Sequence, residues 1–166
     1  MMIIRSEARG DAPSIGSVTQ AAFDGLRHSS QTEAAIVDAL RQAGVLSLSL
    51  VADSDGEIIG HIAFSPVLID GENVGWFGLG PVSVLPEHQG KGVGSALIEQ
   101  GLRQLQDFDA NGCVLLGDPR YYGRFGFTSE HGLRYGTVPS HYFQSRVLHG
   151  ERQTGEVTFH EAFQAG

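Results

Sequence analysis

Apolar and polar positions alternate in two rhythms along this chain of 166 residues, and each rhythm predicts a different kind of element. In residues 46–50, leucines alternate with serines, which is the pattern of a strand with one polar face. Leu97, Ile98 and Leu102 recur with the spacing of one helical face. Short segments rich in Gly and Asp separate such runs, as expected of turns.

These patterns predict an α+β protein without internal repeats or linkers. Strands are expected at residues 3–6, 46–50, 57–64, 76–84, 113–116, 133–138 and 156–159. Helices are expected at residues 11–23, 33–40, 95–105 and 119–125. Asp11 is the expected N-cap of the first helix, and Ser30 with Glu33 has capping-box spacing for the second. The order predicts one domain, residues 1–166, with a mixed and mostly antiparallel sheet flanked by helices.

A glycine-rich segment, Gln89 to Gly94, lies between an expected strand and an expected helix that begins near Ser95. Such a loop lets the backbone approach a ligand, and the N–H groups that start a helix favour an anion such as phosphate. A P-loop is excluded because Lys91 is followed by glycine rather than Ser or Thr. A dinucleotide-binding turn is excluded because Ser95 or Leu97 stands where its third glycine belongs.

The run from Gly80 to Ile98, with its Gln-x-x-Gly-x-Gly core, resembles the acyl-CoA loop of the GNAT N-acetyltransferases. The expected element order is similar to the GNAT fold over nearly the whole chain. The resemblance implies acetyl-CoA as co-substrate and a splayed strand, with Pro81 as the local disruption. The main chain of Val82 and Val84 is then expected to contact the pantetheine. The residues expected around the pyrophosphate are Gln89, Gly90, Lys91, Gly92, Val93, Gly94 and Ser95.

A second stretch, Asp118 to Phe127, resembles the GNAT segment in which a tyrosine precedes a Gly-Phe pair. Tyr122 holds that position relative to Gly126, so the resemblance makes Tyr122 the expected general acid. Coenzyme A leaves as a thiolate, which a nearby phenol can protonate. Tyr121 is expected to pack or to line the substrate pocket.

The general base stays open. Many GNAT enzymes use a carboxylate on the strand before the loop, but residues 73–79 contain neither an acid nor a histidine. Asp118, His61 and a chain of waters are the alternatives, and His61 also fits a structural histidine packed on the sheet. Acceptor recognition is expected from residues 23–33 and 141–143.

Composition limits the partners. The net charge of −8 disfavours binding to nucleic acid and favours a cationic or neutral acceptor.

The single cysteine, Cys113, excludes a disulfide framework and lies in an apolar run, which predicts an inert thiol. No histidine pair has metal-ligand spacing, so no metal is expected. The first residues lack an apolar stretch, which predicts a cytoplasmic protein without a membrane partner.

The primary hypothesis is an N-acetyltransferase that moves an acetyl group from acetyl-CoA to a small-molecule or peptide amine within a ternary complex. Main-chain N–H groups on the splayed strand would polarise the thioester carbonyl. The rival is a GNAT-like domain that binds acyl-CoA as a sensor or complex subunit, without turnover. The absent strand carboxylate supports the rival and Tyr122 opposes it. A homodimer is compatible with either hypothesis.

Overall fold

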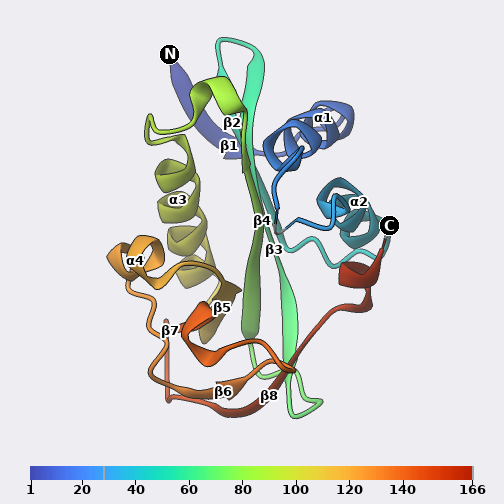
Figure 1. Ribbon diagram of the computed structural model, residues 1–166. Coiled ribbons are helices and arrows are strands. Elements are labelled where there is room, and N and C mark those ends of the chain that lie inside the picture. The colour runs from blue at the N-terminus through green and yellow to red at the C-terminus, as the bar shows by residue number, and fades with distance from the viewer. Residues whose placement is uncertain (28, 166) are drawn as a thin grey trace. The chain divides into compact units, whose positions relative to one another are not determined.

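The computed structural model describes residues 1–27 and 29–165 (Figure 1). The helices are α1 (Ala12–Phe23), α2 (Glu33–Gln42), α3 (Val93–Asp107) and α4 (Pro119–Tyr122). The strands are β1 (Met2–Ser6), β2 (Leu48–Ser54), β3 (Glu57–Ile69), β4 (Trp76–Val84), β5 (Gly112–Leu116), β6 (Gly132–Arg134), β7 (Phe143–Val147) and β8 (Thr154–Phe159). Short 3-10 turns are η1 (Pro86–His88), η2 (Gly123–Phe125), η3 (Ser140–Tyr142) and η4 (Glu161–Gln164).

The strands hydrogen bond in the order β1-β2-β3-β4-β5-β7, and β8 pairs with both β3 and β6. The pairs β4–β5 and β6–β8 are parallel. The pairs β1–β2, β2–β3, β3–β8 and β5–β7 are antiparallel. The sheet is therefore mixed and mostly antiparallel, as the order of elements predicts.

The chain forms two compact units. The first contains Met1–Ser65, Gly80–Gly101 and Glu161–Gly166, and the second contains Pro66–Leu79 and Leu102–His160. Strands β3 and β4 and helix α3 contribute residues to both units. One domain over residues 1–166 stays a prediction.

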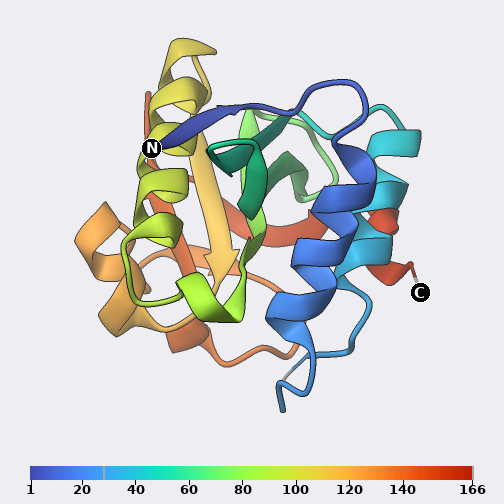
Figure 2. The same cartoon turned by 90° about the horizontal axis from the view of Figure 1, so that it is seen from above.

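The first unit is built around two neighbouring helices, α1 and α2, which lie side by side (Figure 2). Ile15 and Val18 of α1 and Val37 of α2 pack against Val51 of β2 and Ile58 of β3. These side chains follow the apolar stripe of each helix, so removing them from water stabilises both helices on the sheet.

The C-terminal turn completes a second apolar cluster of the first unit. Ala162 is buried against Ile36 and Leu40 of α2, and Phe163 packs beside them. A segment distant in sequence thus covers the face of α2 that α1 leaves open.

The second unit has its own apolar core around Trp76 and Phe143. The other buried members are Val67, Ile69, Val114, Leu133 and Val157. A methyl group on Gly112 would overlap the indole of Trp76, so the pairing of β4 with β5 requires glycine there. Cys113 is fully buried, and this burial raises the pKa of its thiol.

Two predicted caps differ in detail from the structure. Asp11 occupies the N-cap position of α1, but its carboxylate accepts from the backbone N–H of Ala8 and from the Arg5 guanidinium rather than from the helix. Thr32 precedes α2, and Glu33 is bonded by the hydroxyl of Ser29. The capping box expected from Ser30 and Glu33 is therefore wrong, because α2 begins at Glu33 itself.

Three strand predictions also need correction. β3 runs past residue 64 to Ile69, since Val67 and Ile69 join the second unit's core. β6 ends at Arg134 rather than residue 138. β7 was not predicted, because its buried positions include polar residues; the Gln144 side chain donates to the Gly117 carbonyl.

Candidate active site

The glycine-rich loop leads directly from η1 into α3 within the first unit. Gly90 and Gly92 have φ values of +76° and +86°, a left-handed conformation that favours glycine. No atom lies within 4 Å of a methyl group placed on either glycine, so the backbone is open to solvent at both. The Gln89 side chain donates to the Val84 carbonyl at 3.0 Å and ties the start of the loop to the end of β4.

Helix α3 begins at Val93, earlier than the predicted start near Ser95. The first intrahelical bond described runs from the Ala96 N–H to the Gly92 carbonyl. The N–H groups of the first turn have no carbonyl of a preceding turn to bind, so the positive end of the helix lies at the glycine loop. The residues expected around a pyrophosphate therefore form one continuous loop and helix start, with Gln89 to Gly92 exposed.

Strand β4 presents main-chain groups away from β3 at the two expected pantetheine positions. The Leu85 N–H donates to the Ile59 carbonyl of β3 at 2.9 Å. Because consecutive residues of a strand turn their backbone groups to opposite sides, Val82 and Val84 direct theirs away from β3. The parallel register with β5 covers Trp76 to Gly78, and β4 continues beyond it to Val84. Pro81 lies in that continuation, after a cis peptide bond.

Tyr122 lies at the end of α4 in the second unit. Its ring packs edge-on against Tyr121, with centroids 4.9 Å apart, and near Phe125 and Phe127. Burial, with a further contribution from Tyr121, raises the pKa of Tyr122 to about 12. The phenol is therefore protonated at neutral pH, which suits a proton donor rather than a base.

Tyr121 has the packing role expected of it. It contacts Phe125 edge-on at 5.5 Å, and the guanidinium of Arg124 lies 4.7 Å from its ring centroid. Such a cation–π contact, together with the edge-on contact, holds the ring in place.

Asp118 serves as the N-cap of α4 rather than as a poised base. Its carboxylate accepts from the backbone N–H of Arg120 at 2.9 Å and from the Arg120 guanidinium. These bonds lower its pKa, the bond from the Arg120 side chain first. A carboxylate held this way is a weak acceptor for an amine proton.

His61 is the alternative base candidate and lies in the first unit. Its ring is fully buried on β3, and its Nε2 is 2.8 Å from the Ser49 hydroxyl. Ser49 in turn donates to Glu7, which forms a two-bond ion pair with Arg41. Burial lowers the pKa of His61 to about 4, so the ring is neutral at neutral pH.

The two segments expected to recognise the acceptor differ in exposure. Within residues 23–33, Leu26 is exposed and the Gln31 side chain donates to the Phe23 carbonyl; His28 lies outside the described residues. Within residues 141–143, the rings of His141 and Tyr142 are 4.1 Å apart and exposed, whereas Phe143 is buried. Phe143 therefore belongs to the core and not to a recognition surface.

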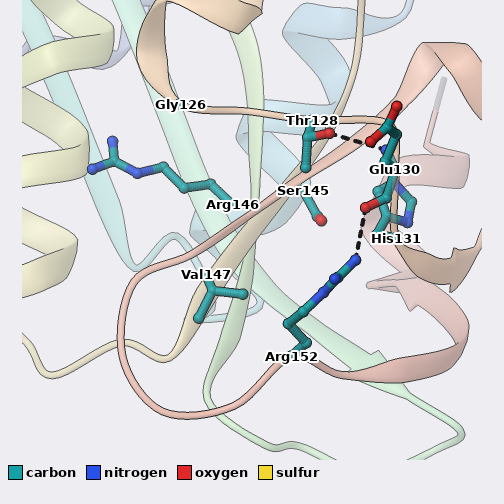
Figure 3. A pocket seen from close by; sticks show the side chains of 8 residues that line it. All are labelled: Gly126, Thr128, Glu130, His131, Ser145, Arg146, Val147 and Arg152. Atoms are coloured by element: carbon teal, nitrogen blue, oxygen red, sulfur yellow. Dashed lines mark hydrogen bonds between the residues drawn. The ribbon is translucent and has the colours of Figure 1, made fainter.

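A pocket of about 380 Å³ lies elsewhere in the second unit (Figure 3). It is lined by Gly126, Thr128, Glu130, His131, Ser145, Arg146, Val147 and Arg152. Its two arginines donate to main-chain carbonyls, Arg146 to Phe125 and Arg152 to Glu130. His131 donates from Nε2 to the Phe143 carbonyl and accepts the Leu133 N–H at Nδ1, so both of its ring nitrogens are bonded.

Metal ligands do not gather in the part of the chain that the structure describes: no group of three or more His, Cys, Asp or Glu residues there could hold an ion. Over the same residues, no helix has the length and apolar character needed to cross a membrane.

Comparison with known proteins identifies the class to which this fold and loop belong. A family model described as "Acetyltransferase (GNAT) domain" matches residues 46–129, and the chain belongs to that family. It is an N-acetyltransferase by class, which confirms the resemblance and the fold class that the sequence predicts.

Particular relatives extend over the whole chain. The N-acetyltransferase YhbS of Escherichia coli K12 is 39% identical over 171 aligned residues, 98% of each chain. A crystal structure of a GNAT family acetyltransferase from Brucella melitensis in complex with acetyl-CoA shares 52% identity and a TM-score of 0.89 over 98% of each chain. The structure of E. coli YhbS in complex with CoA shares 37% identity and a TM-score of 0.89, over 98% of this chain and 92% of that one.

Proposed function

We propose that this N-acetyltransferase transfers an acetyl group from acetyl-CoA directly to an amine while both are bound. The loop between β4 and α3 carries the proposal, because its glycines are open and its helix start favours an anion. Relatives crystallised with acetyl-CoA and with CoA support the same co-substrate for this chain.

The proposed contacts to the co-substrate are mostly main-chain contacts. Gln89, Gly90, Lys91, Gly92, Val93, Gly94 and Ser95 surround the pyrophosphate. Val82 and Val84 bind the pantetheine through their backbone groups, which point away from β3. An N–H group on this strand polarises the thioester carbonyl and stabilises the negative charge that develops on its oxygen.

Tyr122 is the proposed general acid. After the amine nitrogen bonds to the carbonyl carbon, the C–S bond breaks and the phenol gives its proton to the departing sulfur. The phenol carries this proton at neutral pH and gives it up as the C–S bond breaks and negative charge develops on the sulfur. The phenolate then regains a proton from solvent.

The acceptor is proposed to be a primary amine on a small molecule or a peptide. The net charge of −8 favours encounter with a cationic acceptor. It does not determine what fits the site.

The test combines two measurements on the whole chain. Acetyl-CoA binding is measured by titration calorimetry, and thiol release is followed with a panel of small amines, polyamines, amino acids and peptides. Amine-dependent thiol release supports the transferase, and binding without release for any amine supports the sensor instead. Absence of binding overturns the assignment of the loop.

A further inference from the structure

The antiparallel ladder between β5 and β7 stops in the middle of a residue pair. Its last full pair is Leu116 with Phe143. One residue further, the Gly117 N–H donates to the Tyr142 carbonyl at 2.9 Å. In a regular ladder the Tyr142 N–H would return a bond to the Gly117 carbonyl, but it donates at 3.0 Å to the Pro139 carbonyl at the start of η3. The turn therefore takes away the backbone partner of the Gly117 carbonyl.

The side chain of Gln144 replaces the missing bond. Its Nε2 donates to the Gly117 carbonyl at 2.8 Å, and a carbonyl can only accept, so the nitrogen end of the amide faces it. Gln144 is 0% exposed, and among the residues that the structure describes its Oε1 has no hydrogen-bond partner. A buried amide with one end unpaired costs free energy that an apolar residue would not. Stability of the strand alone therefore gives little reason for a glutamine here.

Gly117 depends on such a bond because it cannot carry a side chain. A methyl group at this position would overlap the ring of Tyr122. Glycine has more conformational freedom than any other residue, so a glycine at the end of a strand is poorly fixed by its own dihedral preferences. The bonds to Tyr142 and Gln144 hold both sides of Gly117 instead.

The peptide group that Gln144 holds leads directly into α4. Its carbonyl belongs to Gly117 and its nitrogen to Asp118, and because a peptide group is planar, the bond from Gln144 fixes the orientation of the whole group. Asp118 is the N-cap of α4, and its own carbonyl accepts the Tyr122 N–H at 3.0 Å. The orientation of this peptide group thus determines how α4 begins and where the Tyr122 ring lies.

We propose that Gln144 is a positioning residue that holds Tyr122 in place through the peptide group between Gly117 and Asp118. This proposal rests on the proposed function, in which Tyr122 protonates the departing sulfur. Gln144 itself transfers no proton. Its effect falls on the chemical step rather than on acetyl-CoA binding, because the loop from Gln89 to Ser95 belongs to the first unit and Gln144 to the second.

The first test compares Gln144→Met with a matched control, Ser145→Ala. Methionine keeps the length and burial of the side chain but cannot donate to the Gly117 carbonyl. Ser145 is the next residue of β7, is polar and is 4% exposed, so its variant reproduces the loss of a buried polar group from the same strand. With the best amine of the panel, we expect kcat of Gln144→Met to fall about tenfold. The Kd for acetyl-CoA should stay within about twofold of wild type, as should kcat of Ser145→Ala.

A second variant, Gln144→Glu, tests the hydrogen bond itself through its pH profile. Glutamate has nearly the same shape, but its carboxyl group can donate to the Gly117 carbonyl only while it is protonated. Burial favours the protonated form and raises the pKa of such a group. The kcat of Gln144→Glu, divided by that of the wild type at the same pH, should therefore rise toward one as pH falls. The same ratio for Gln144→Met should not change with pH.

The double variant Tyr122→Phe/Gln144→Met tests whether Gln144 acts through Tyr122. Once the phenol is absent, its position no longer matters, so adding Gln144→Met to Tyr122→Phe should lower kcat less than about twofold. A buried glutamine with a general structural role would instead cause the same further loss in both backgrounds.

A third measurement needs no amine acceptor. In ¹³C spectra of ring-labelled tyrosine, the signals of Tyr122 are identified by their loss in Tyr122→Phe. They should shift in Gln144→Met and stay in place in Ser145→Ala. Unmoved ring signals or an unchanged kcat in Gln144→Met, or an equal further loss in the double variant, overturns the positioning role alone. Absence of thiol release by the wild type with every amine overturns the proposed function, and the catalytic role of Gln144 with it.

Discussion

Gly117 lies against the ring of Tyr122, so close that a methyl group at position 117 would overlap two ring carbons of the tyrosine, Cε2 and Cδ2. The same methyl group would lie 3.3 Å from Leu115. The end of β5 therefore supports the ring of the proposed acid, and its position depends on the absence of a side chain.

Substituting Gly117→Ala should displace the Tyr122 ring. We expect kcat to fall at least tenfold, since small displacements of an acid impair proton transfer. The free energy of unfolding should fall by about 1–3 kcal/mol, as overpacking does. Gly123→Ala is the control, because a methyl group there meets no atom within 4 Å. A crystal structure of Gly117→Ala with the ring unmoved and kcat retained would show that this contact is dispensable.

Removing the hydroxyl of Tyr122 tests the acid itself. Tyr122→Phe keeps the ring packing against Tyr121 and Phe127, so folding should be unaffected. We expect kcat to fall about 100-fold with acetyl-CoA affinity unchanged. Tyr121→Phe should retain kcat, because Tyr121 makes ring contacts with its neighbours. Equal kinetics for the two variants would remove Tyr122 from the mechanism.

A bulky residue in the glycine loop tests the pyrophosphate site. Gly92→Val should raise the Kd for acetyl-CoA at least tenfold, because a side chain would occupy the open space and disfavour the φ of +86°. The control is Gly10→Val, whose glycine also has a positive φ, +96°, and open surroundings. Both variants should lose about 1–2 kcal/mol of stability. Calorimetry that gives both variants wild-type affinity would count against the loop.

The buried His61 makes stability depend on pH. Its pKa is lowered from 6.5 to about 4, so the unfolded chain binds a proton in this window that the folded protein does not. Stability should therefore fall as pH drops from about 6.5 to 4, by about 3 kcal/mol from this residue. Urea unfolding at successive pH values should show a smaller fall for His61→Gln. Parallel curves for the two proteins would mean that the ring is protonated in the native state.

Glu7 also makes stability depend on pH, mainly in a lower range than His61. Its pKa is lowered, chiefly by the bond from Arg41, so its contribution to stability is present above the unfolded value near 4.3 and lost as pH falls below it. The two windows overlap near pH 4, and His61→Gln distinguishes them because it removes the loss at higher pH and leaves that of Glu7.

The sequence predicted the structure best at positions where a residue type serves a single structural purpose. The glycines at 90 and 92 predicted a close-approach loop, and the structure gives both a left-handed conformation with open surroundings. The apolar positions of α2 and α3 were identified because a helical stripe must be buried.

Sequence reasoning failed where polar residues are buried. The sequence did not predict β7, because the polar residues Gln144 and Ser145 are buried in this strand. No alternation of apolar and polar residues indicates that they are internal. The hydrogen-bonded groups near His61 could not be predicted either, since Glu7, Arg41 and Ser49 come from three segments of the chain and meet only in the folded unit.

Cys113 has a practical consequence for the assays proposed above. It is the only cysteine of the chain, and in the native state its thiol is buried and hard to ionise. A disulfide dye that reacts with thiolates should therefore report coenzyme A and ignore the enzyme. The same dye, added without acetyl-CoA, measures the rate at which the second unit opens. Each chain that unfolds exposes one thiol and therefore reacts with one equivalent of dye.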